Sequence, residues 1–168
     1  MRRRYGDCVA EPQVSLREIT SETVRAICTL AVRPEQRGYV ADNAVSIAQA
    51  YFEPKAWFRA VYAEETPVGF VMLFQDVEAE EYFLWRFMIA GEHQGRGHGK
   101  RALDLVAEHV RGLPGASELL SSYVPGDDGP RDFYLRYGFV ETERVEDGEH
   151  VIRLDLSIQP DSGLHSGT

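Results

Sequence analysis

The sequence predicts a single α/β domain built around a sheet of mixed strand direction. Two observations carry this prediction. Short apolar runs with strand-like patterns alternate with segments of helical period, and a glycine-rich stretch joins the longest apolar run to a helical pattern. With 168 residues, 43% of them hydrophobic, the chain is long enough to bury a sizeable core. We expect a flexible lead-in at residues 1–13, one domain at residues 14–157 and a disordered tail at residues 158–168.

The first half of the domain is predicted to form a strand, two helices and a hairpin of strands. Residues 14–19 alternate between apolar and polar side chains, as a half-buried strand does. Pro34 and Pro54 end the two helical patterns that follow. Thr66 and Pro67 are expected to turn the chain between the strands of the hairpin. The elements expected here are strand 14–19, helix 24–32, a helix within 42–54, and strands 57–64 and 68–74.

The second half is predicted to alternate strands and helices before it closes with a hairpin. Its first strand, residues 82–90, is apolar throughout its interior apart from Arg86, which indicates that both of its faces are covered. Pro130 suits the first turn of a short helix, and Gly138 suits the end of that helix. The elements expected here are strand 82–90, helix 101–111, strand 118–124, helix 131–137, and strands 139–145 and 150–156. The complete order is therefore β-α-α-β-β-β-α-β-α-β-β.

Charge and cysteine content exclude several functional classes. The formal net charge is −9, from 18 basic and 27 acidic residues, so we expect no nucleic-acid partner, because phosphate backbones bind basic surfaces. An acidic chain is compatible with a cationic substrate. No apolar run approaches the roughly 18 residues of a membrane span, and the N-terminus lacks the apolar stretch of a signal peptide. Cys8 and Cys28 give neither a metal-ligand spacing nor a disulfide framework, so we expect a cytoplasmic chain with no metal and no membrane partner.

The glycine-rich stretch at residues 94–100 (QGRGHGK) is predicted to bind a phosphate-bearing ligand. It lies between a strand and a helix, and the first turn of a helix carries unpaired backbone N–H groups at the positive end of the helix dipole. Glycines let the backbone approach a bulky anion. A Walker loop requires Ser or Thr after the lysine, where this chain has Arg101, and a Rossmann fingerprint requires a different glycine spacing.

The spacing Gln-x-x-Gly-x-Gly, formed by Gln94, Gly97 and Gly99 after a long strand, resembles the acetyl-CoA pyrophosphate loop of the Gcn5-related N-acetyltransferase (GNAT) family. The segment at residues 133–139 (FYLRYGF) is similar to the family's short helix with a tyrosine, followed by Gly-Phe at the start of the sixth strand. The resemblance covers residues 14–156. It implies a mixed, mostly antiparallel central sheet flanked by helices, and transfer of an acetyl group from acetyl-CoA to an amine.

Two shorter segments, residues 35–54 and 84–89, are similar to the bacterial spermine/spermidine (diamine) acetyltransferase branch of that family. This similarity implies a small polyamine or a related primary amine as the acceptor, and direct transfer in a ternary complex. A homodimer is among the possible assemblies. Two alternatives stay open: the acceptor is a drug amine, an amino acid or a protein N-terminus, or the chain is a non-catalytic CoA-binding module.

The resemblance also implies residues for the donor side of the site. Tyr134 matches the tyrosine that protonates the sulfur of CoA, whereas Tyr137 is expected to pack against the sheet. The backbone N–H near Met88 or Ile89 is implied as the oxyanion donor. Asp127 stands near the place of an asparagine that contacts CoA, and an ionised carboxylate cannot donate the same hydrogen bonds. The residues implied for CoA binding are Phe87, Met88, Ile89, Gln94, Gly95, Arg96, Gly97, His98, Gly99, Lys100 and Asp127.

The acceptor side and the general base are assigned from chemistry and from the same resemblance. The resemblance implies a base that is either a glutamate on the long strand or a water relay; Glu80 and Glu81 lie near the start of that strand, and Glu81 is the candidate base. Arg86, inside that strand, needs a carboxylate partner or else shapes the pocket. Aromatic rings and acidic groups suit a polyammonium chain, and residues 35–54 contain both. The residues predicted for the acceptor are Glu35, Tyr39, Asn43, Tyr51 and Arg86.

Overall fold

The structure of the chain, a computed structural model, describes residues 13–157. The predicted tail, and all of the predicted lead-in except residue 13, lie outside the described residues. Within them, strands and helices follow the predicted order, with two additional 3₁₀ turns, η1 and η2. The elements are β1 (Val14–Arg17), α1 (Val24–Thr29), η1 (Pro34–Gln36), α2 (Asn43–Phe52), β2 (Ala56–Ala63), β3 (Thr66–Asp76), β4 (Glu81–Ile89), η2 (Gly91–His93), α3 (His98–Arg111), β5 (Glu118–Tyr123), α4 (Arg131–Tyr137), β6 (Val140–Glu146) and β7 (Glu149–Asp155).

Seven strands form one sheet, in the order β1-β2-β3-β4-β5-β7-β6. Every neighbouring pair is antiparallel except β4 and β5, which are parallel. α3 connects these two strands, because a parallel pair cannot be joined by a tight turn and needs a crossover. The mixed, mostly antiparallel sheet implied by the family resemblance is therefore confirmed.

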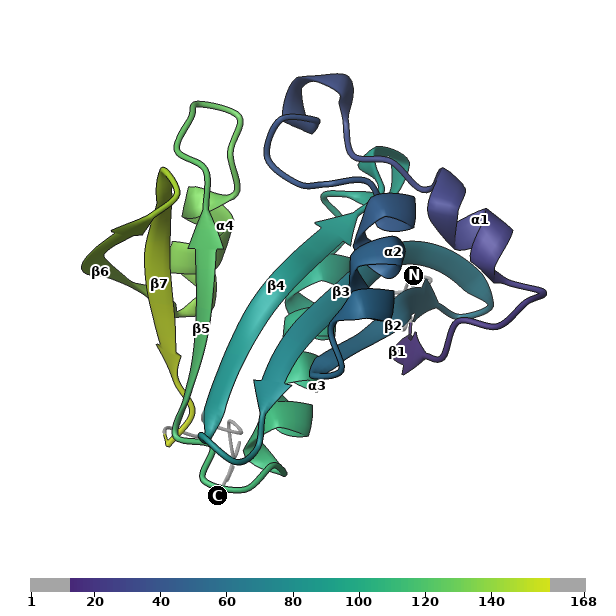
Figure 1. The fold of residues 1–168 in the computed structure, drawn as a ribbon. Coiled ribbons are helices and arrows are strands. Elements are labelled where there is room, and N and C mark those ends of the chain that lie inside the picture. Colours follow the sequence, from purple (N-terminus) through teal and green to yellow (C-terminus); the bar gives the residue numbers. More distant parts are fainter. Residues whose placement is uncertain (1–12, 158–168) are drawn as a thin grey trace, which may run out of the picture.

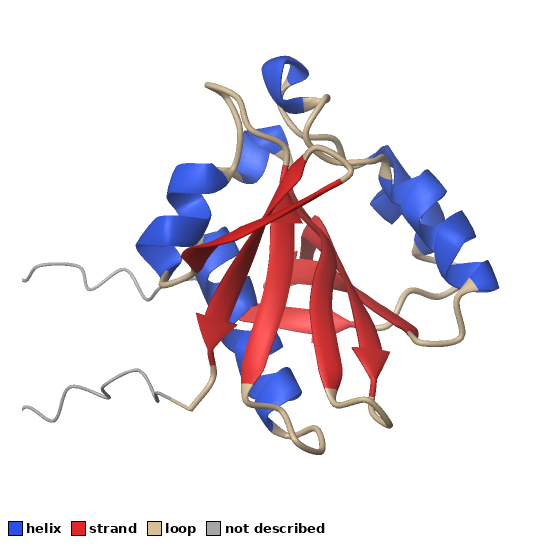
Figure 2. Cartoon of the chain, turned by 60° about the vertical axis from the view of Figure 1, so that its left-hand side comes forward, coloured by secondary structure: helices blue, strands red, loops and turns tan. Residues whose placement is uncertain are grey.

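Helices cover both faces of this sheet (Figures 1 and 2). On one face, Ile27 of α1 lies in a buried cluster with Phe70, Met72 and Met88, and residues of α2 pack against that cluster. On the other face, α3 and Tyr134 of α4 pack on the opposite side chains of β2, β3 and β4. The strands alternate their side chains between these two clusters, as the two-residue period requires. The buried stripe of α3 is the one that helical spacing predicts: Ala102, Leu103, Val106, Ala107 and Val110.

The parallel pair is short. In the described part of the chain, β4 and β5 pair only at Phe83 with Leu120 and at Leu84 with Ser121. The buried hydroxyl of Ser121 donates to the carbonyl oxygen of Leu84 at 3.0 Å, at the second of these steps. Beyond it the two strands diverge, as Figure 1 shows. Among residues 13–157, the edge of β4 from residue 85 to residue 89 therefore has no strand partner on the side that faces β5.

Three local features differ from the sequence-based prediction. Thr66 and Pro67 belong to β3 and not to a turn, because Glu64, with φ of 52°, turns the chain two residues earlier. α3 begins at His98, three residues before the predicted start, so the last glycine of the glycine-rich stretch lies inside the helix. α1 ends at Thr29, where the chain becomes extended, instead of continuing to residue 32.

Candidate functional site

A cavity of about 810 Å³ opens where β4 and β5 diverge. Its walls come from the C-terminal half of β4, the loop between β4 and α3, the loop after β5, the start of α4 and the connection between η1 and α2. This volume falls in the range of ligand and cofactor sites. The walls come from both halves of the chain, so the cavity exists only when the chain is folded.

The loop between β4 and α3 presents backbone N–H groups to this cavity. Gly95 and Gly97 have φ of 76° and 82°, in the left-handed region. A Cβ at either position would meet nothing within 4 Å, so the backbone conformation, rather than crowding, requires glycine there. In residues 13–157, no acceptor is found for the N–H groups of residues 95–100. The loop and the first turn of α3 therefore have the features of an anion site.

Gln94 and Gly99 connect this loop to its surroundings. The side-chain amide of Gln94 donates to the carbonyl oxygen of Ile89 at 2.9 Å and to Gln36 Oε1 at 2.8 Å. A Cβ at Gly99 would approach the ring of Phe133 to 3.1 Å, so glycine allows α3 to pack closely on α4. Gln94, predicted as a CoA contact, thus uses its amide nitrogen to hold the loop against β4 and η1.

The charged side chains of the loop take different positions. His98 and Lys100 line the cavity, whereas Arg96 is exposed and does not. Burial lowers the pKa of His98, with added contributions from His93 and Arg96, so its imidazole is neutral near pH 7. Lys100 Nζ lies 3.2 Å from Asp104 Oδ2, one turn further along α3, and most of its side chain is exposed. Within residues 94–100, Lys100 therefore offers a cation to the cavity and His98 offers a neutral ring.

Phe87, Met88 and Ile89 lie on the unpaired stretch of β4 that borders the cavity. On their other side these residues pair with β3. An extended ligand can add to such an edge through main-chain hydrogen bonds, as a further strand would. The ring of Phe87 stacks on Phe133 of α4, with a centroid separation of 6.0 Å and an interplanar angle of 8°. This contact joins β4 to α4 beside the opening.

Tyr134 of α4 lines the cavity although the residue is only 5% exposed. Burial raises the pKa of its phenol to about 12; a hydrogen bond with Ser121 opposes this shift, and the charge of Glu149 adds to it. The phenol is therefore protonated at neutral pH and well above it. Tyr137 lies outside the cavity wall, packs against the core as predicted, and donates to Asp104 Oδ1 at 3.1 Å.

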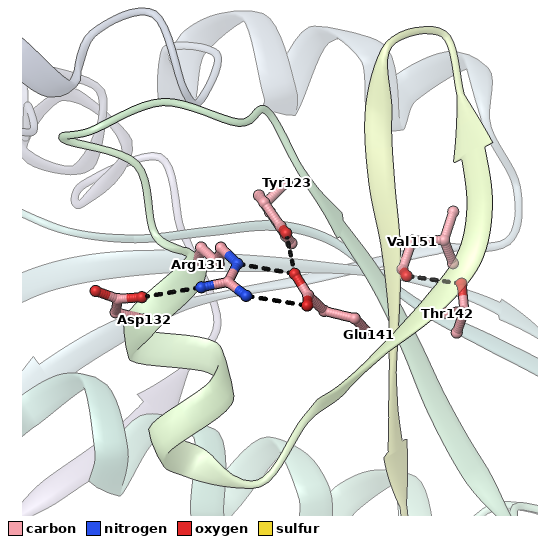
Figure 3. A network of polar contacts seen from close by, with 6 residues as sticks. All are labelled: Tyr123, Arg131, Asp132, Glu141, Thr142 and Val151. Carbon is pink, nitrogen blue, oxygen red and sulfur yellow. Dashed lines mark hydrogen bonds and ion pairs between the residues drawn. The ribbon is translucent and has the colours of Figure 1, made fainter.

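A network of ion pairs and hydrogen bonds anchors the N-terminus of α4, the helix that carries Tyr134 (Figure 3). Arg131 Nε and Nη2 contact the two carboxylate oxygens of Glu141 on β6 at 2.8 and 3.0 Å. The hydroxyl of Tyr123, at the end of β5, donates to the same carboxylate at 2.5 Å. These bonds, that of Arg131 first, lower the pKa of Glu141 to about 2. The network joins α4 to β5 and β6.

Arg86 brings a cation into the cavity from β4. Its Nη1 donates to the carbonyl oxygen of Trp85 at 2.8 Å, and its Nη2 donates to Gln49 Oε1 on α2 at 3.2 Å. Its Nε is buried without a hydrogen-bond partner, and no carboxylate in residues 13–157 forms an ion pair with it. Burial lowers the pKa of this guanidinium, and the charge of Glu149 opposes that shift. Of the two alternatives for Arg86, the structure favours a role in shaping the pocket.

Three of the residues predicted for the acceptor and the base lie away from the cavity. Glu35 of η1 and Tyr51 of α2 are exposed, Tyr51 to 85%, because they project from the outer sides of these elements. Glu81 is also exposed and opens β4 at the end opposite to the glycine-rich loop, where it pairs with Asp76 of β3. The structure therefore does not bring Glu81 to the cavity, although Glu81 and Phe87 share one strand.

Asn43 and Asp127 also differ in position from the prediction. Asn43 is 1% exposed, and its side-chain amide donates to the carbonyl oxygen of Ile27 at 2.9 Å and contacts Met88 Sδ at 3.7 Å. It therefore links α2 to α1 and β4 inside the core. Asp127 is exposed in the loop after β5, and its neighbour Asp128 lines the cavity in its place.

Tyr39 does reach the cavity, from the connection between η1 and α2. A Cβ added to Gly126 would collide with its phenol, and one added to Gly129 would come within 3.0 Å of its ring. These two glycines of the loop after β5 leave the space that the ring occupies. Tyr39 therefore bridges the two sides of the opening. Of the residues predicted for the acceptor, Tyr39 and Arg86 are brought together around the cavity.

Glu149 lines the cavity as well, and the sequence-based prediction does not include it. The sequence places it in an acidic turn after Gly148, where an exposed role is the ordinary expectation. The structure makes it the first residue of β7, next to β5, and Ser122 Oγ of β5 donates to Glu149 Oε2. Starting the last predicted strand one residue earlier would have placed Glu149 in a strand. Its position on the cavity wall has no local signal.

In residues 13–157, no group of three or more His, Cys, Asp or Glu side chains is arranged to hold a metal ion. The same part of the chain contains no helix that is both long enough and apolar enough to cross a membrane. The thiol of Cys28, in α1, is free and half-buried.

The cavity combines an anion site at a helix N-terminus with a free strand edge and a buried, protonated phenol. An extended ligand bearing phosphate groups can bind along such a wall, and the phenol can stabilise an anion that leaves from it. Acyl transfer from a phosphate-bearing carrier needs these features, so the fold and the site define an acyltransferase. The chain belongs to the acetyltransferase (GNAT) family, whose sequence model matches residues 40–139. The family resemblance of the sequence is thus confirmed.

Individual relatives span most of the chain. The spermine/spermidine N(1)-acetyltransferase of Bacillus subtilis (strain 168) is 26% identical over 154 residues, which are 85% of this chain and 99% of that protein. An N-acetyltransferase of Thermoplasma acidophilum in complex with coenzyme A has a TM-score of 0.65 and 15% identity, over 85% of this chain and 99% of that chain. N-acetylglutamate synthase of Neisseria gonorrhoeae, complexed with coenzyme A and N-acetyl-glutamate, has a TM-score of 0.66 and 19% identity, over 88% of this chain and 36% of that chain. At these identities the structural likeness concerns the fold.

Proposed function

We propose that this acetyltransferase moves the acetyl group of acetyl-CoA directly to the nitrogen of a small polyamine, such as spermidine or spermine, or of a related primary amine. The observation that carries this proposal is the divergence of β4 from β5. It gathers the anion site of residues 95–100, the unpaired edge of β4 and the phenol of Tyr134 around one cavity. Donor and acceptor meet in that cavity, and no acyl-enzyme forms.

The donor is bound by the loop and by β4. Backbone N–H groups of residues 95–100 donate to the pyrophosphate of acetyl-CoA, and Lys100 adds a positive charge. The amide-bearing arm of the donor extends the sheet along the unpaired edge at residues 87–89. The N–H of Met88 or Ile89 donates to the thioester carbonyl oxygen as negative charge develops on it.

Tyr134 assists departure of the thiolate. Its pKa of about 12 exceeds the usual value near 8.5 of a thiol, so the phenol is protonated when the reaction begins. Because the phenol is the weaker acid of the two, it first stabilises the developing thiolate as a hydrogen-bond donor. A proton released by the attacking amine then completes the thiol through Tyr134.

Two findings support a polyamine as the acceptor. The Bacillus subtilis relative is named for spermine and spermidine, and it matches this chain over 99% of its own length. Acidic side chains of Asp128, Asp132 and Glu149 line the cavity, and the net charge of −9 raises the local concentration of cations. The ring of Tyr39 offers an aromatic face to a polyammonium chain.

One observation favours a second class of acceptor. Arg86 lines the cavity with a buried Nε that has no hydrogen-bond partner in the described part of the chain. Guanidinium groups bind carboxylates in a two-point geometry, so an amino acid could place its carboxylate here and its amine at the thioester. The protein would then acetylate an amine that carries an anionic group.

A thiol-release assay separates these acceptors. Purified protein is given acetyl-CoA with spermidine, spermine, glutamate, an aminoglycoside or a short peptide, and kcat/KM is measured for each. The proposal expects the highest kcat/KM with a polyamine. A preference for glutamate, abolished by Arg86→Gln, would replace the polyamine with an amino acid. Tight binding of CoA without thiol release from any amine would contradict the proposed activity and favour the binding module.

A further inference from the structure

The cavity has two sides with different chemistry, and Glu149 belongs to the side opposite Tyr134. On β5, Tyr123 packs with its ring 5.5 Å from that of His150 on β7, and Tyr123 belongs to the core cluster on the α3 and α4 face. Successive side chains of a strand point to opposite faces, so Ser122 and Glu149, the neighbours of these residues, point to the α1 and α2 face.

Arg86 lies on that same face, since its guanidinium reaches Gln49 of α2. Glu149 and Arg86 both line the cavity. Glu149 comes from β7, which pairs with β5, and Arg86 comes from β4, which diverges from β5 there. Figure 1 shows β7 beside β5, on the side of β5 that faces away from β4. The charge of Glu149 acts on both Arg86 and Tyr134. The cavity therefore holds a carboxylate whose charge acts on both the cation of β4 and the phenol of α4.

The position of this carboxylate is fixed. Ser122 Oγ donates to Glu149 Oε2, and Ser122 itself pairs with Val151 in the β5–β7 ladder. No cation in residues 13–157 forms an ion pair with Glu149. The second carboxylate oxygen is thus available to a ligand, and a half-buried carboxylate held in this way binds a cation well.

We propose that Glu149 is the group that binds the acceptor ammonium and accepts its proton before attack on the thioester. This inference rests on the proposed function, because it assigns a role within the same reaction. It also gives the base a position that Glu81, exposed at the far end of β4, does not have.

The acceptor enters as R–NH₃⁺, and Glu149 removes one proton, which later passes to solvent. The nitrogen lone pair attacks the thioester carbon, the N–C bond forms, the C–S bond breaks, and its electron pair stays on sulfur. The nitrogen loses a second proton, which neutralises the thiolate through Tyr134. The products are the N-acetyl amine, CoA thiol and one proton.

The test compares Glu149→Gln with Glu146→Gln. Glu146 faces Glu149 across the same hairpin, is exposed, and does not line the cavity, so its variant removes the same charge without touching the site. We expect Glu149→Gln to lower kcat/KM for the best acceptor at least about 100-fold, in the range of general base catalysis. The affinity for acetyl-CoA, measured by calorimetry, should change less than twofold. Glu146→Gln should match the wild type in both.

A second readout separates proton acceptance from mere packing. Two acceptors of similar size are compared: an alkyl amine with a pKa near 10.4 and a less basic amine with a pKa near 8. The ammonium form of the less basic amine loses its proton more readily, so it depends less on a base. The loss caused by Glu149→Gln should be several-fold smaller for the weaker base. Ser122→Ala, which frees the carboxylate, should lower kcat/KM less than Glu149→Gln does.

The outcomes distinguish this inference from the proposed function. If the wild type acetylates an amine and Glu149→Gln retains kcat/KM within threefold, Glu149 has no such role and the proposed function stands. Equal losses for both amines at unchanged acetyl-CoA affinity would also overturn the role as proton acceptor. If the wild type releases no thiol with any amine, the proposed function itself has failed.

Discussion

The proposed donor side and the proposed acceptor side of the cavity are built in different ways. The donor side uses consecutive residues: two glycines of positive φ, the first turn of α3 and the adjoining end of β4. The acceptor side is assembled from distant segments, with Tyr39 before α2, Arg86 on β4 and Glu149 on β7. A local sequence pattern therefore describes the first side, whereas the second side depends on which strands lie next to each other.

The two sides also differ in which groups do their work: backbone groups on the donor side and side chains on the acceptor side. Backbone groups dominate the donor side, so its function depends on conformation and tolerates many side chains. Side chains dominate the acceptor side, so single substitutions there change the acceptor or the rate. Substitutions on each side of the cavity test this division.

Removing one hydroxyl at the centre of the cavity should have the largest effect. Tyr134→Phe is expected to lower kcat by about 10² to 10³, because the leaving thiolate loses its hydrogen-bond and proton donor. The dissociation constant for acetyl-CoA should stay within about threefold, since the phenol is not part of the anion site. Steady-state kinetics and calorimetry measure the two quantities. An unchanged kcat would remove Tyr134 from the mechanism.

Tyr137→Phe is the matched control for that substitution. Tyr137 lies three residues after Tyr134 on α4 and outside the cavity wall. The substitution removes the hydroxyl that donates to Asp104 of α3. The expected cost is about 1 kcal/mol in the free energy of unfolding, the usual value of one hydrogen bond, with kcat unchanged.

The donor side should respond to backbone conformation. Gly97→Ala places a Cβ at φ of 82°, which strains the loop by about 1 kcal/mol or more and disturbs its N–H groups. We expect the dissociation constant of acetyl-CoA to rise about tenfold. Gly148→Ala introduces a Cβ at φ of 83° in open space, outside the cavity wall. It should bring similar strain and leave acetyl-CoA affinity at the wild-type value; an equal loss in both variants would point to general destabilisation.

The anchor of α4 should respond to acid. Arg131 lowers the pKa of Glu141 to about 2, so the ion pair contributes stability above the ordinary pKa near 4.5 and loses it as the pH falls toward 2. The melting temperature of the wild type should exceed that of Glu141→Gln at pH 7, and the two should converge near pH 2. Glu143→Gln, an exposed neighbour on β6, serves as the control. A difference that persists at pH 2 would contradict this origin.

Two tyrosines of the predicted acceptor segment should behave differently. Tyr51 is 85% exposed, so Tyr51→Ser should change the acceptor KM less than twofold and the free energy of unfolding by less than about 0.5 kcal/mol. Tyr39 packs against the loop after β5, so Tyr39→Ala should raise the acceptor KM about tenfold, which corresponds to about 1.4 kcal/mol. A rise in KM of similar size for Tyr51→Ser would restore Tyr51 to the acceptor site.

The sequence carries most of the fold, because each element has its own periodic pattern. The order of strands and helices is the predicted one, and the buried stripe of α3 appears at the expected residues. Errors fall at boundaries, where local signals compete. Thr66 and Pro67 have turn chemistry, yet they continue β3, because Glu64 takes the left-handed conformation first.

The site divides in the same way. Glycine spacing and a strand-to-helix junction locate the anion site, because both are properties of neighbouring residues. The sequence of α2 does not show which face of the helix is buried. Asn43 and Tyr51 are both predicted at the acceptor, but Asn43 lies in the core and Tyr51 lies in solvent. Glu81 shares a strand with Phe87, but the strand's length separates it from the cavity.

Local patterns in the sequence indicate the family, the order of elements and the anion site at residues 94–100, since glycine spacing and a strand-to-helix junction involve only neighbouring residues. The folded chain, and no local pattern, places the carboxylate of Glu149 on the cavity wall. Glu149 lies beside β5 because β7 lies between β5 and β6, and it faces the cavity because β4 and β5 diverge after Leu84 and Ser121. Such long-range placement follows from packing over the whole sheet, and no short pattern of residues encodes it.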